Sequence, residues 1–117
     1  MIPIYWKKFV ENHNLIGQEI EFPWPGESDL NAIIEILDYN AIKMEATEYW
    51  PGIGAFKHGY IPFGGCAIGT GDPFFININD GEDGPLYKID HEETTDIPKG
   101  IYVMLQSYKS LIEWHNK

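Results

Sequence analysis

Apolar residues recur at helical spacing in three segments of the chain, which predicts three amphipathic helices. The first helix is expected to start at Pro3, because proline suits the first helical turn. Ser28 or Asp29 is expected to cap the second helix, and Ser107 the third. The three stripes are formed by Trp6, Phe9, Val10 and His13; by Leu30, Ile33, Ile34 and Leu37; and by Tyr108, Leu111, Ile112 and His115.

Other segments have the alternation or the β-rich composition of strands. Strands are expected at "QEIEF", "AIKMEATEYW", "YIPFG", "CAIG" and "PFFININ", and "PLYKID" is expected to pair with "PFFININ" as a hairpin around the loop "DGEDG". The continuous apolar run in "GIYVMLQ" predicts a buried strand. Helices segregated from strands predict an α+β fold, with one antiparallel sheet and helices packed on one side. The 117 residues are expected to form a single domain over residues 1–117.

The balance of charge excludes several classes of partner. The chain has 18 acidic and 8 basic residues, all of the latter lysines, and a formal net charge of −10. Nucleic acid and anionic membranes are therefore not expected as partners, because phosphate binding needs a basic surface. A single cysteine, Cys66, allows no disulfide within the chain, and neither a signal-peptide pattern nor a membrane-spanning apolar run is present. These features predict a cytoplasmic protein.

Most of the negative charge falls in one segment. Residues 72–96 contain eight acidic residues and one lysine, Lys88, and so carry −7 of the formal charge of −10. Solubility alone could explain an acidic chain. If this segment forms a hairpin, however, its carboxylates crowd one edge or face, and a basic partner would relieve their repulsion. The residues predicted to bind such a partner are Asp72, Asp80, Glu82, Asp83, Asp90, Glu92 and Glu93.

The same segment contains motifs that resemble catalytic or metal sites but lack their requirements. The glycines between residues 64 and 71 are not followed by the Lys-Ser/Thr of a phosphate loop, so they are expected to serve turns and bulges. No register of "NINDGEDG" fits a calcium-binding EF-hand. Asp90 to Glu93 has no second histidine at ligand spacing, and Cys66 is expected to pack in a strand. We therefore expect no metal, no cofactor and no catalytic residues.

Residues 60–116 resemble the SUKH superfamily, also called Smi/Knr-type proteins. The resemblance is carried by "IPFG", by "GD" before a strand, by "GPLY" after a short acidic loop, by "DHE", and by a final strand followed by a serine-capped helix. The start of the chain fits this family less closely, and residues 19–50 do not align with it. The residues that match the motif are Pro62, Gly64, Gly71, Asp72, Gly84, Pro85, Tyr87, Asp90, His91 and Glu92.

The resemblance implies an α+β fold without known catalysis. Bacterial SUKH proteins are immunity proteins that bind a toxin, often a nuclease or a deaminase, and fungal members are regulatory scaffolds. Our first hypothesis is therefore a non-enzymatic immunity protein that neutralises a basic toxin through an acidic surface. The alternatives are a regulatory scaffold domain, or a small-ligand-binding module or hydrolase whose pocket is lined by Trp50, Asp72 and His91.

Overall fold

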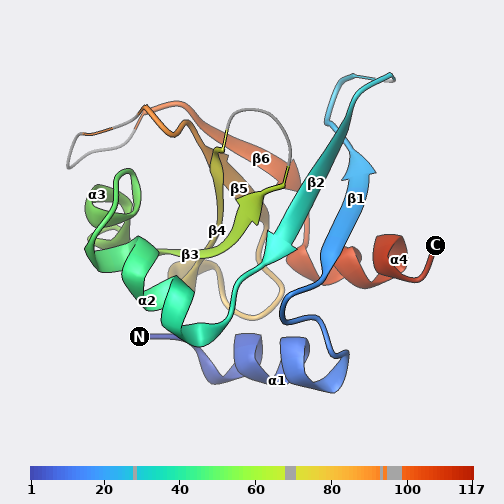
Figure 1. Cartoon of the computed structure of the whole chain (residues 1–117), viewed down its shortest axis with the longest axis horizontal. Coiled ribbons are helices and arrows are strands. Elements are labelled where there is room, and N and C mark those ends of the chain that lie inside the picture. Colours follow the sequence, from blue (N-terminus) through green and yellow to red (C-terminus); the bar gives the residue numbers. More distant parts are fainter. Residues whose placement is uncertain (28, 68–70, 93, 95–98) are drawn as a thin grey trace.

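The chain folds around one six-stranded sheet in which each strand pairs antiparallel with the next, in the order β1-β2-β3-β4-β5-β6 (Figure 1). The computed structural model describes residues 1–27, 29–67, 71–92, 94 and 99–117. The strands are β1 (Glu19–Pro23), β2 (Asn31–Ile36), β3 (Tyr60–Cys66), β4 (Pro73–Asn77), β5 (Leu86–Ile89) and β6 (Ile101–Leu105). The α-helices are α1 (Ile4–Asn12), α2 (Tyr39–Thr47), α3 (Gly52–Phe56) and α4 (Leu111–His115). Short 3-10 turns occupy Ile78–Asp80 and Tyr108–Ser110.

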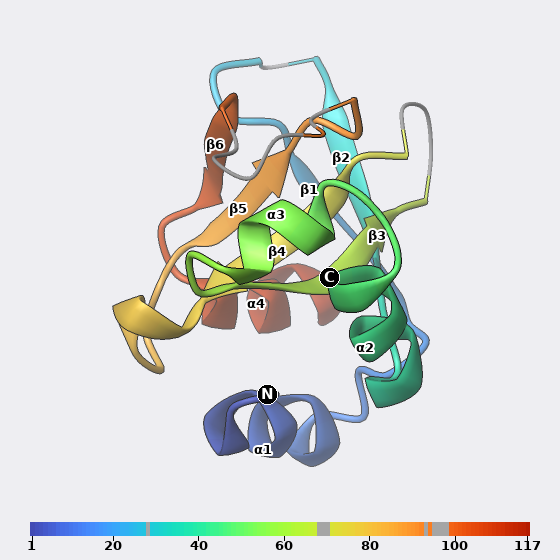
Figure 2. The same cartoon turned by 90° about the vertical axis from the view of Figure 1, so that its left-hand side faces the viewer.

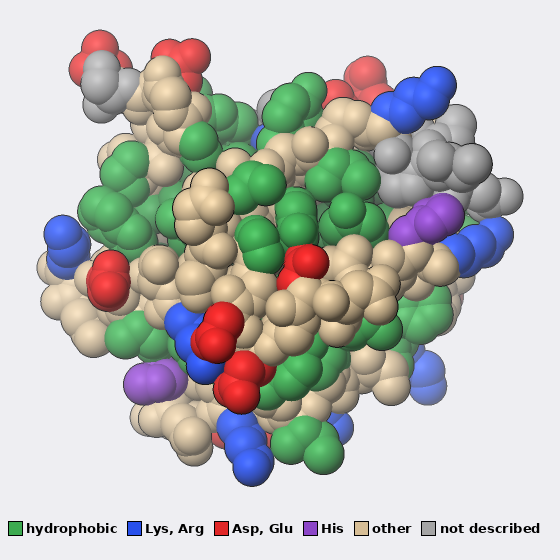
Figure 3. Space-filling model, turned by 180° about the vertical axis from the view of Figure 1, so that it is seen from behind, with side chains coloured by type: hydrophobic (Ala, Val, Ile, Leu, Met, Phe, Trp, Pro, Cys, Tyr) green, Lys and Arg blue, Asp and Glu red, His purple; other side chains and the backbone are tan. Residues whose placement is uncertain are grey.

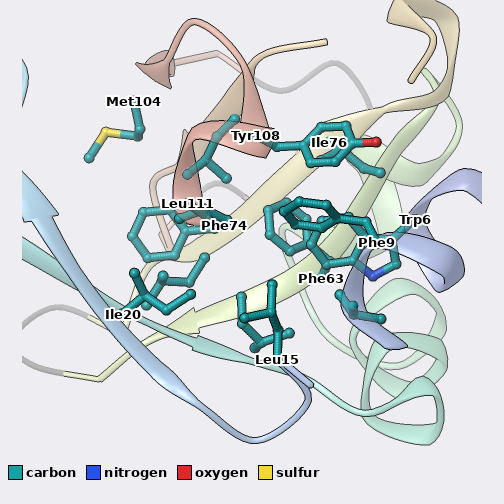
Figure 4. Close-up of a cluster of buried hydrophobic side chains, with 14 of the residues drawn as sticks. Trp6, Phe9, Leu15, Ile20, Phe63, Phe74, Ile76, Met104, Tyr108 and Leu111 are labelled. Atoms are coloured by element: carbon teal, nitrogen blue, oxygen red, sulfur yellow. The ribbon is translucent and has the colours of Figure 1, made fainter. Parts of the chain in front are cut away.

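The main core lies on the side of the sheet that carries α1 and α4 (Figures 1 and 2). In this core, Trp6 of α1 packs against Phe63 of β3, with ring centroids 4.1 Å apart, and Phe9 packs edge-on against Tyr108 at 5.1 Å (Figure 4). These four aromatic rings join the N-terminal helix, the sheet and the C-terminal segment. The predicted α+β class with a single antiparallel sheet is confirmed.

A second, smaller cluster lies on the other face of the sheet. Successive side chains of a strand point to opposite faces. Phe74 of β4 accordingly belongs to the main core, while Phe75 packs with Ile89 of β5 and with Ala55 of the short helix α3. The centre of the sheet is therefore covered on both faces, which explains why every residue of β4 is buried.

For two segments in the first half of the chain, the predicted type of secondary structure is wrong. Residues 31–36 form strand β2 instead of a helix, with Ala32, Ile34 and Ile36 buried in alternation. Residues 39–47 form α2 instead of a strand, with Ile42 and Ala46 buried one turn apart. An isoleucine-rich run fits both periods, and pairing with β1 on one side and β3 on the other favours the strand.

The second half of the chain agrees more closely with expectation. β4 and β5 form the predicted hairpin, and Ser107 caps the final turns, where its Oγ accepts a hydrogen bond from the Lys109 backbone N–H at 3.2 Å. The run "GIYVMLQ" does form a strand, β6, but the prediction that it is buried is wrong. β6 is the last strand of the sheet, and Tyr102 and Val103 are 54% and 42% exposed.

The glycines around residues 64–71 serve turns and close packing where the structure describes them. Gly71 has φ +75°, a conformation that other residues rarely adopt. A Cβ at Gly64 would lie 2.5 Å from Cδ1 of Ile34 on the neighbouring strand, and the register between β3 and β4 shifts between Pro62 and Gly64. Gly69 lies outside the described residues. Among the helices described, none has the length and apolar character needed to cross a membrane.

Candidate functional site

Asp72, just before β4, is the centre of a buried polar cluster. Its Oδ2 lies 2.9 Å from the Nζ of Lys88, and its Oδ1 accepts a hydrogen bond from the His91 backbone N–H at 2.8 Å. The same Oδ1 lies 2.6 Å from Nδ1 of the His91 ring. Asp72 is only 4% exposed, so the prediction that it contributes to a partner-binding surface is wrong. It binds the end of β5 to the start of β4.

Lys88 occupies a position on the sheet that normally suits an apolar residue. It lies opposite Phe74 and two residues after Leu86, both of which belong to the main core. Its ammonium lies 5.2 Å from the ring centroid of Trp24 and 4.9 Å from that of Tyr102, which is within the range of cation–π attraction. We refer to Trp24, Asp72, Lys88, His91 and Tyr102 as the Lys88 cluster.

A cavity of about 380 Å³ opens beside the Lys88 cluster, between the segment after β1 and the edge strand β6. The volume lies within the range of pockets that bind small molecules or single side chains. Its walls combine two aromatic rings, apolar side chains and one exposed carboxylate. The residues that line it are Trp24, Pro25, Lys88, Asp90, Tyr102, Val103 and Met104.

His91 is held in a strongly acidic environment. The hydrogen bond to Asp72 raises the pKa of the His91 imidazole most, partial burial lowers it, and the charges of Asp72, Asp90 and Glu92 raise it further. Asp72, Asp90 and His91 could bring three ligand atoms within 4.8 Å of one another. However, both oxygens of Asp72 already bind Lys88 or His91, and the Lys88 ammonium would repel a divalent cation. The geometry thus favours an ion-paired cluster over a metal site.

Asp80, Glu82 and Asp83 form an exposed acidic loop between β4 and β5. The loop has a defined conformation, because the Tyr87 hydroxyl donates to Oδ2 of Asp80 at 2.6 Å and the Tyr108 backbone N–H donates to the Gly84 carbonyl at 2.9 Å. Burial, followed by the hydrogen bond to Asp80, raises the pKa of the Tyr87 phenol.

One lysine of the C-terminal segment contacts the acidic loop. The Nζ of Lys109 lies 3.2 Å from Oε2 of Glu82 and 3.0 Å from Oδ1 of Asp83. The hydrogen bonds to these two carboxylates, Asp83 first, raise the pKa of the Lys109 ammonium. With three carboxylates and one ammonium, the loop and Lys109 together keep a net negative charge.

The acidic residues of the hairpin do not form one crowded face, so that prediction is wrong. Asp80, Glu82 and Asp83 precede β5, whereas Asp90 and Glu92 follow it. The two groups therefore lie at opposite ends of a strand, because β5 is fully extended between them. Figure 3 accordingly shows acidic side chains in separate groups, with hydrophobic side chains between them. Glu93 lies outside the described residues.

A third group of carboxylates was not predicted from the sequence. Glu19, Glu21 and Glu35 point outward from β1 and β2, and Glu19 lies directly opposite Glu35 in the register. Like charges in this position repel each other. The alternation of "QEIEF" does predict the outward direction of Glu19 and Glu21. The opposition with Glu35 could not be foreseen, because residues 30–37 were expected to be helical.

None of the better-formed cavities in the described part of the chain is lined by Trp50, Asp72 or His91, the residues suggested for a small-ligand pocket. Trp50 lies in the short connection between α2 and α3, and the main cavities of the described part are lined by other side chains. One cavity of about 580 Å³ lies between α1, the acidic loop and the C-terminal segment, and Tyr5, Phe9 and Lys109 are among its lining residues. Cys66 is half-buried at the end of β3 and packs against the main core.

No protein-family model, no curated protein and no solved structure matches this chain. The SUKH-like pattern therefore remains a prediction from the sequence. Five of the motif residues have structural roles: Gly71 has a positive φ, Gly64 packs closely against Ile34, and Asp72, Tyr87 and His91 make hydrogen bonds within the β4–β5 hairpin.

Proposed function

We propose that this domain is a non-enzymatic protein-binding domain of the immunity type, which neutralises a cationic toxin of the nuclease or deaminase class. The observation that carries the proposal is the acidic loop. Asp80, Glu82 and Asp83 are exposed, and the loop is preorganised by its hydrogen bonds with Tyr87 and Tyr108. Lys109 pairs with Glu82 and Asp83, so the loop keeps a negative excess. A cationic partner would relieve the repulsion that remains.

The distribution of charge over the molecule supports the same proposal. The formal net charge of −10 attracts a cationic protein over several ångströms and speeds their encounter. The glutamates of β1 and β2 add a second exposed acidic area. The apolar wall of the 580 Å³ cavity, which borders Glu82, offers the desolvated contact that most interfaces need at their centre.

The polar cluster at Asp72 supports a binding function more than a catalytic one. A general acid or base must reach a substrate with a free lone pair or proton. Here both carboxylate oxygens of Asp72 are bound within the cluster, and Lys88 is almost fully buried between two rings. These contacts stabilise the hairpin that carries the acidic loop.

The proposal is tested by co-expression in a bacterium. Nuclease- and deaminase-type toxin domains encoded next to the gene of this protein would be expressed with and without the chain, and colony survival would be counted. The test variant carries Asp80→Asn, Glu82→Gln and Asp83→Asn, which removes three charges but keeps the shapes and the acceptor for Tyr87. We expect the wild type to restore survival and this variant to lose most of the protection.

A matched control separates local contact from net charge. Glu27, Glu48 and Glu113 are exposed residues outside the acidic loop, so Glu27→Gln, Glu48→Gln and Glu113→Gln remove the same amount of charge elsewhere. This control should protect nearly as well as the wild type. Equal loss in both triple variants would show that only long-range charge matters, and no protection by the wild type against any such toxin would reject the immunity function.

A further inference from the structure

Among the residues that the structure describes, nothing protects the outer edge of β6, the last strand of the sheet. Exposed edges are normally blocked by charged residues, proline or a covering helix, because their free backbone groups can pair with another chain. β6 has the sequence "IYVML", which contains neither charge nor proline. The opposite edge, β1, carries Glu19, Glu21 and Pro23 and is contacted by α4. In Figure 2, β6 forms the border of the molecule, with no helix or strand drawn beyond it.

A groove runs beside this edge. The sheet curls so that the segment after β1 lies across from β6, and the 380 Å³ cavity separates Trp24 and Pro25 from Tyr102, Val103 and Met104. Tyr102 and Val103 are half-exposed, whereas Met104, which also lines the cavity, is buried. The groove thus offers an apolar site for a side chain next to the outer edge of β6, which is the arrangement used in recognition by strand addition.

The charges around the groove favour a positively charged occupant. Asp90 lines the cavity, and beside Gly100, where β6 begins, the two carboxylates Asp90 and Glu92 outnumber the one lysine that lines the same hollow, Lys99. Glu82 and Asp83 lie at the other end, because Leu105 pairs with Leu86 just after the acidic loop, and the single Lys109 ammonium offsets only one of their two charges. The Lys88 ammonium in the wall does not offset these carboxylates, since it is already paired with Asp72.

We propose that β6 and the adjoining groove bind an extended segment of a partner protein by strand addition, and that this segment carries lysine or arginine side chains beside an apolar one. An added strand of about five residues would span roughly 17 Å along β6 and bring cationic side chains to the acidic groups at its two ends. The inference rests on the proposed function, since the segment would belong to the cationic toxin, and it names the surface and the mode of binding.

The test uses the whole protein and two defined probes. One is a fluorescein-labelled peptide of about eight residues that alternates lysine and valine, and the other replaces each lysine with glutamate. Binding is measured by fluorescence polarisation at low and at physiological salt. Amide chemical shifts of ¹⁵N-labelled protein locate the site. We expect the cationic peptide alone to bind, with the largest shifts in Ile101–Leu105 and at the Trp24 indole.

Two substitutions at one exposed position separate the roles of edge and charge. Val103→Lys adds a repelling charge at the edge and should weaken binding of the cationic peptide at least about tenfold. Val103→Glu changes the same side chain with the opposite sign and should bind as well as the wild type or better. Met44→Lys is the control, because Met44 is 37% exposed on α2 and lines neither the groove nor the 580 Å³ cavity. It should leave the affinity unchanged, and the amide spectrum of each variant reports its folding.

Several results would overturn the inference. These are equal binding of both peptides, shifts confined to the acidic loop or to β1, no binding of the cationic peptide at about millimolar concentration, or no effect of Val103→Lys. A concentration-dependent dimer that Val103→Lys dissociates would assign the edge to a second copy of the chain. If the Val103→Lys variant still neutralises the toxin in cells, the proposed binding at the edge of β6 is wrong, while the immunity function stands. If peptide binding is confirmed but no toxin is neutralised, the immunity function alone is wrong.

Discussion

Removing the charge of the buried Asp72 should destabilise the fold more than removing the charge of an exposed carboxylate such as Glu82. Asp72→Asn keeps an oxygen that can accept the hydrogen bond from the His91 backbone N–H. It leaves the Lys88 ammonium, which is 8% exposed, without its anionic partner. The perturbation is therefore confined to one charge in a fixed geometry.

The magnitude follows from the contact distance and the burial. At 2.9 Å, two unit charges attract by about 6 kcal/mol for an effective dielectric constant of about 20. The cost of desolvating both groups offsets most of this attraction, so the net value of the pair is small. Breaking such a pair nevertheless costs about 3–5 kcal/mol, because one buried charge is left alone. The Trp24 and Tyr102 rings retain about 1–2 kcal/mol of cation–π attraction, so we expect a loss of about 3 kcal/mol.

A double-mutant cycle isolates the pair. Lys88→Met replaces the ammonium with an apolar side chain of similar length, and the double variant Asp72→Asn/Lys88→Met removes both charges. The free energies of unfolding are measured in urea at pH 8, above the ordinary titration range of histidine. We expect the double variant to lie within about 1 kcal/mol of the wild type and the coupling energy to reach about 2 kcal/mol.

The control is an exposed carboxylate with a lysine partner. Glu82→Gln removes the same charge from an ion pair with Lys109 on the surface, so the free energy of unfolding should hardly change. A coupling energy below about 0.5 kcal/mol between Asp72 and Lys88, or equal effects of Asp72→Asn and Glu82→Gln, would refute the reasoning. Either outcome would mean that the Lys88 ammonium is hydrated in the folded protein.

Three other measurements test local features of the structure. Gly64→Ala places a Cβ 2.5 Å from the Ile34 side chain and should lower the free energy of unfolding by about 1–3 kcal/mol. Gly65→Ala is the control, because its Cβ would meet no atom within 4 Å, and it should be neutral or slightly stabilising. Equal effects of the two substitutions would contradict the close approach of Gly64 to Ile34. Because the pKa of His91 is raised in the folded state, the ion pair with Asp72 stabilises the fold fully below the ordinary pKa of 6.5, and this stabilisation is lost as pH rises through the folded pKa. His91→Asn should therefore remove the pH dependence of the free energy of unfolding in urea over this interval. An unchanged pH dependence would reject the pairing of His91 with Asp72. Burial raises the pKa of the Tyr108 phenol to about 12. In an ultraviolet titration, the wild type should therefore show one phenol ionisation near pH 12 that Tyr108→Phe lacks. If the ionisation lost in Tyr108→Phe lies near pH 10 instead, the Tyr108 ring is exposed.

The second half of the chain was easier to predict than the first because its local signals agree with one another. In residues 73–90, β-rich runs flank the turn-forming "DGEDG", so alternation and turn chemistry both indicate a hairpin. In residues 30–37, isoleucine spacing fits a helix and a strand equally well. The choice depends on Ile34, which pairs with Ile20 on one side and with Cys66 on the other. No local pattern contains that information.

The candidate site was predictable in composition but not in arrangement. The sequence shows one lysine among eight acidic residues, yet it does not show that Lys88 binds Asp72 or lies between Trp24 and Tyr102. Alternation along β5 places Lys88 on the same face as Leu86. The outward exposure of β6 depends on the strand order, because an apolar run on an edge strand has the same sequence as one in the centre.

The Lys88 cluster links stability to the proposed binding groove. Lys88 connects the segment after β1 through Trp24, the start of β4 through Asp72, and β6 through Tyr102, so one ammonium fixes the two walls of the groove. Asp72→Asn/Lys88→Met should therefore recover most of the stability but not the affinity for the cationic peptide, because methionine cannot attract both rings as a cation does. Matched polarisation titrations of the double variant and the wild type decide the point. Equal affinities would show that apolar packing of Trp24 and Tyr102, without the shared cation, sets the shape of the groove.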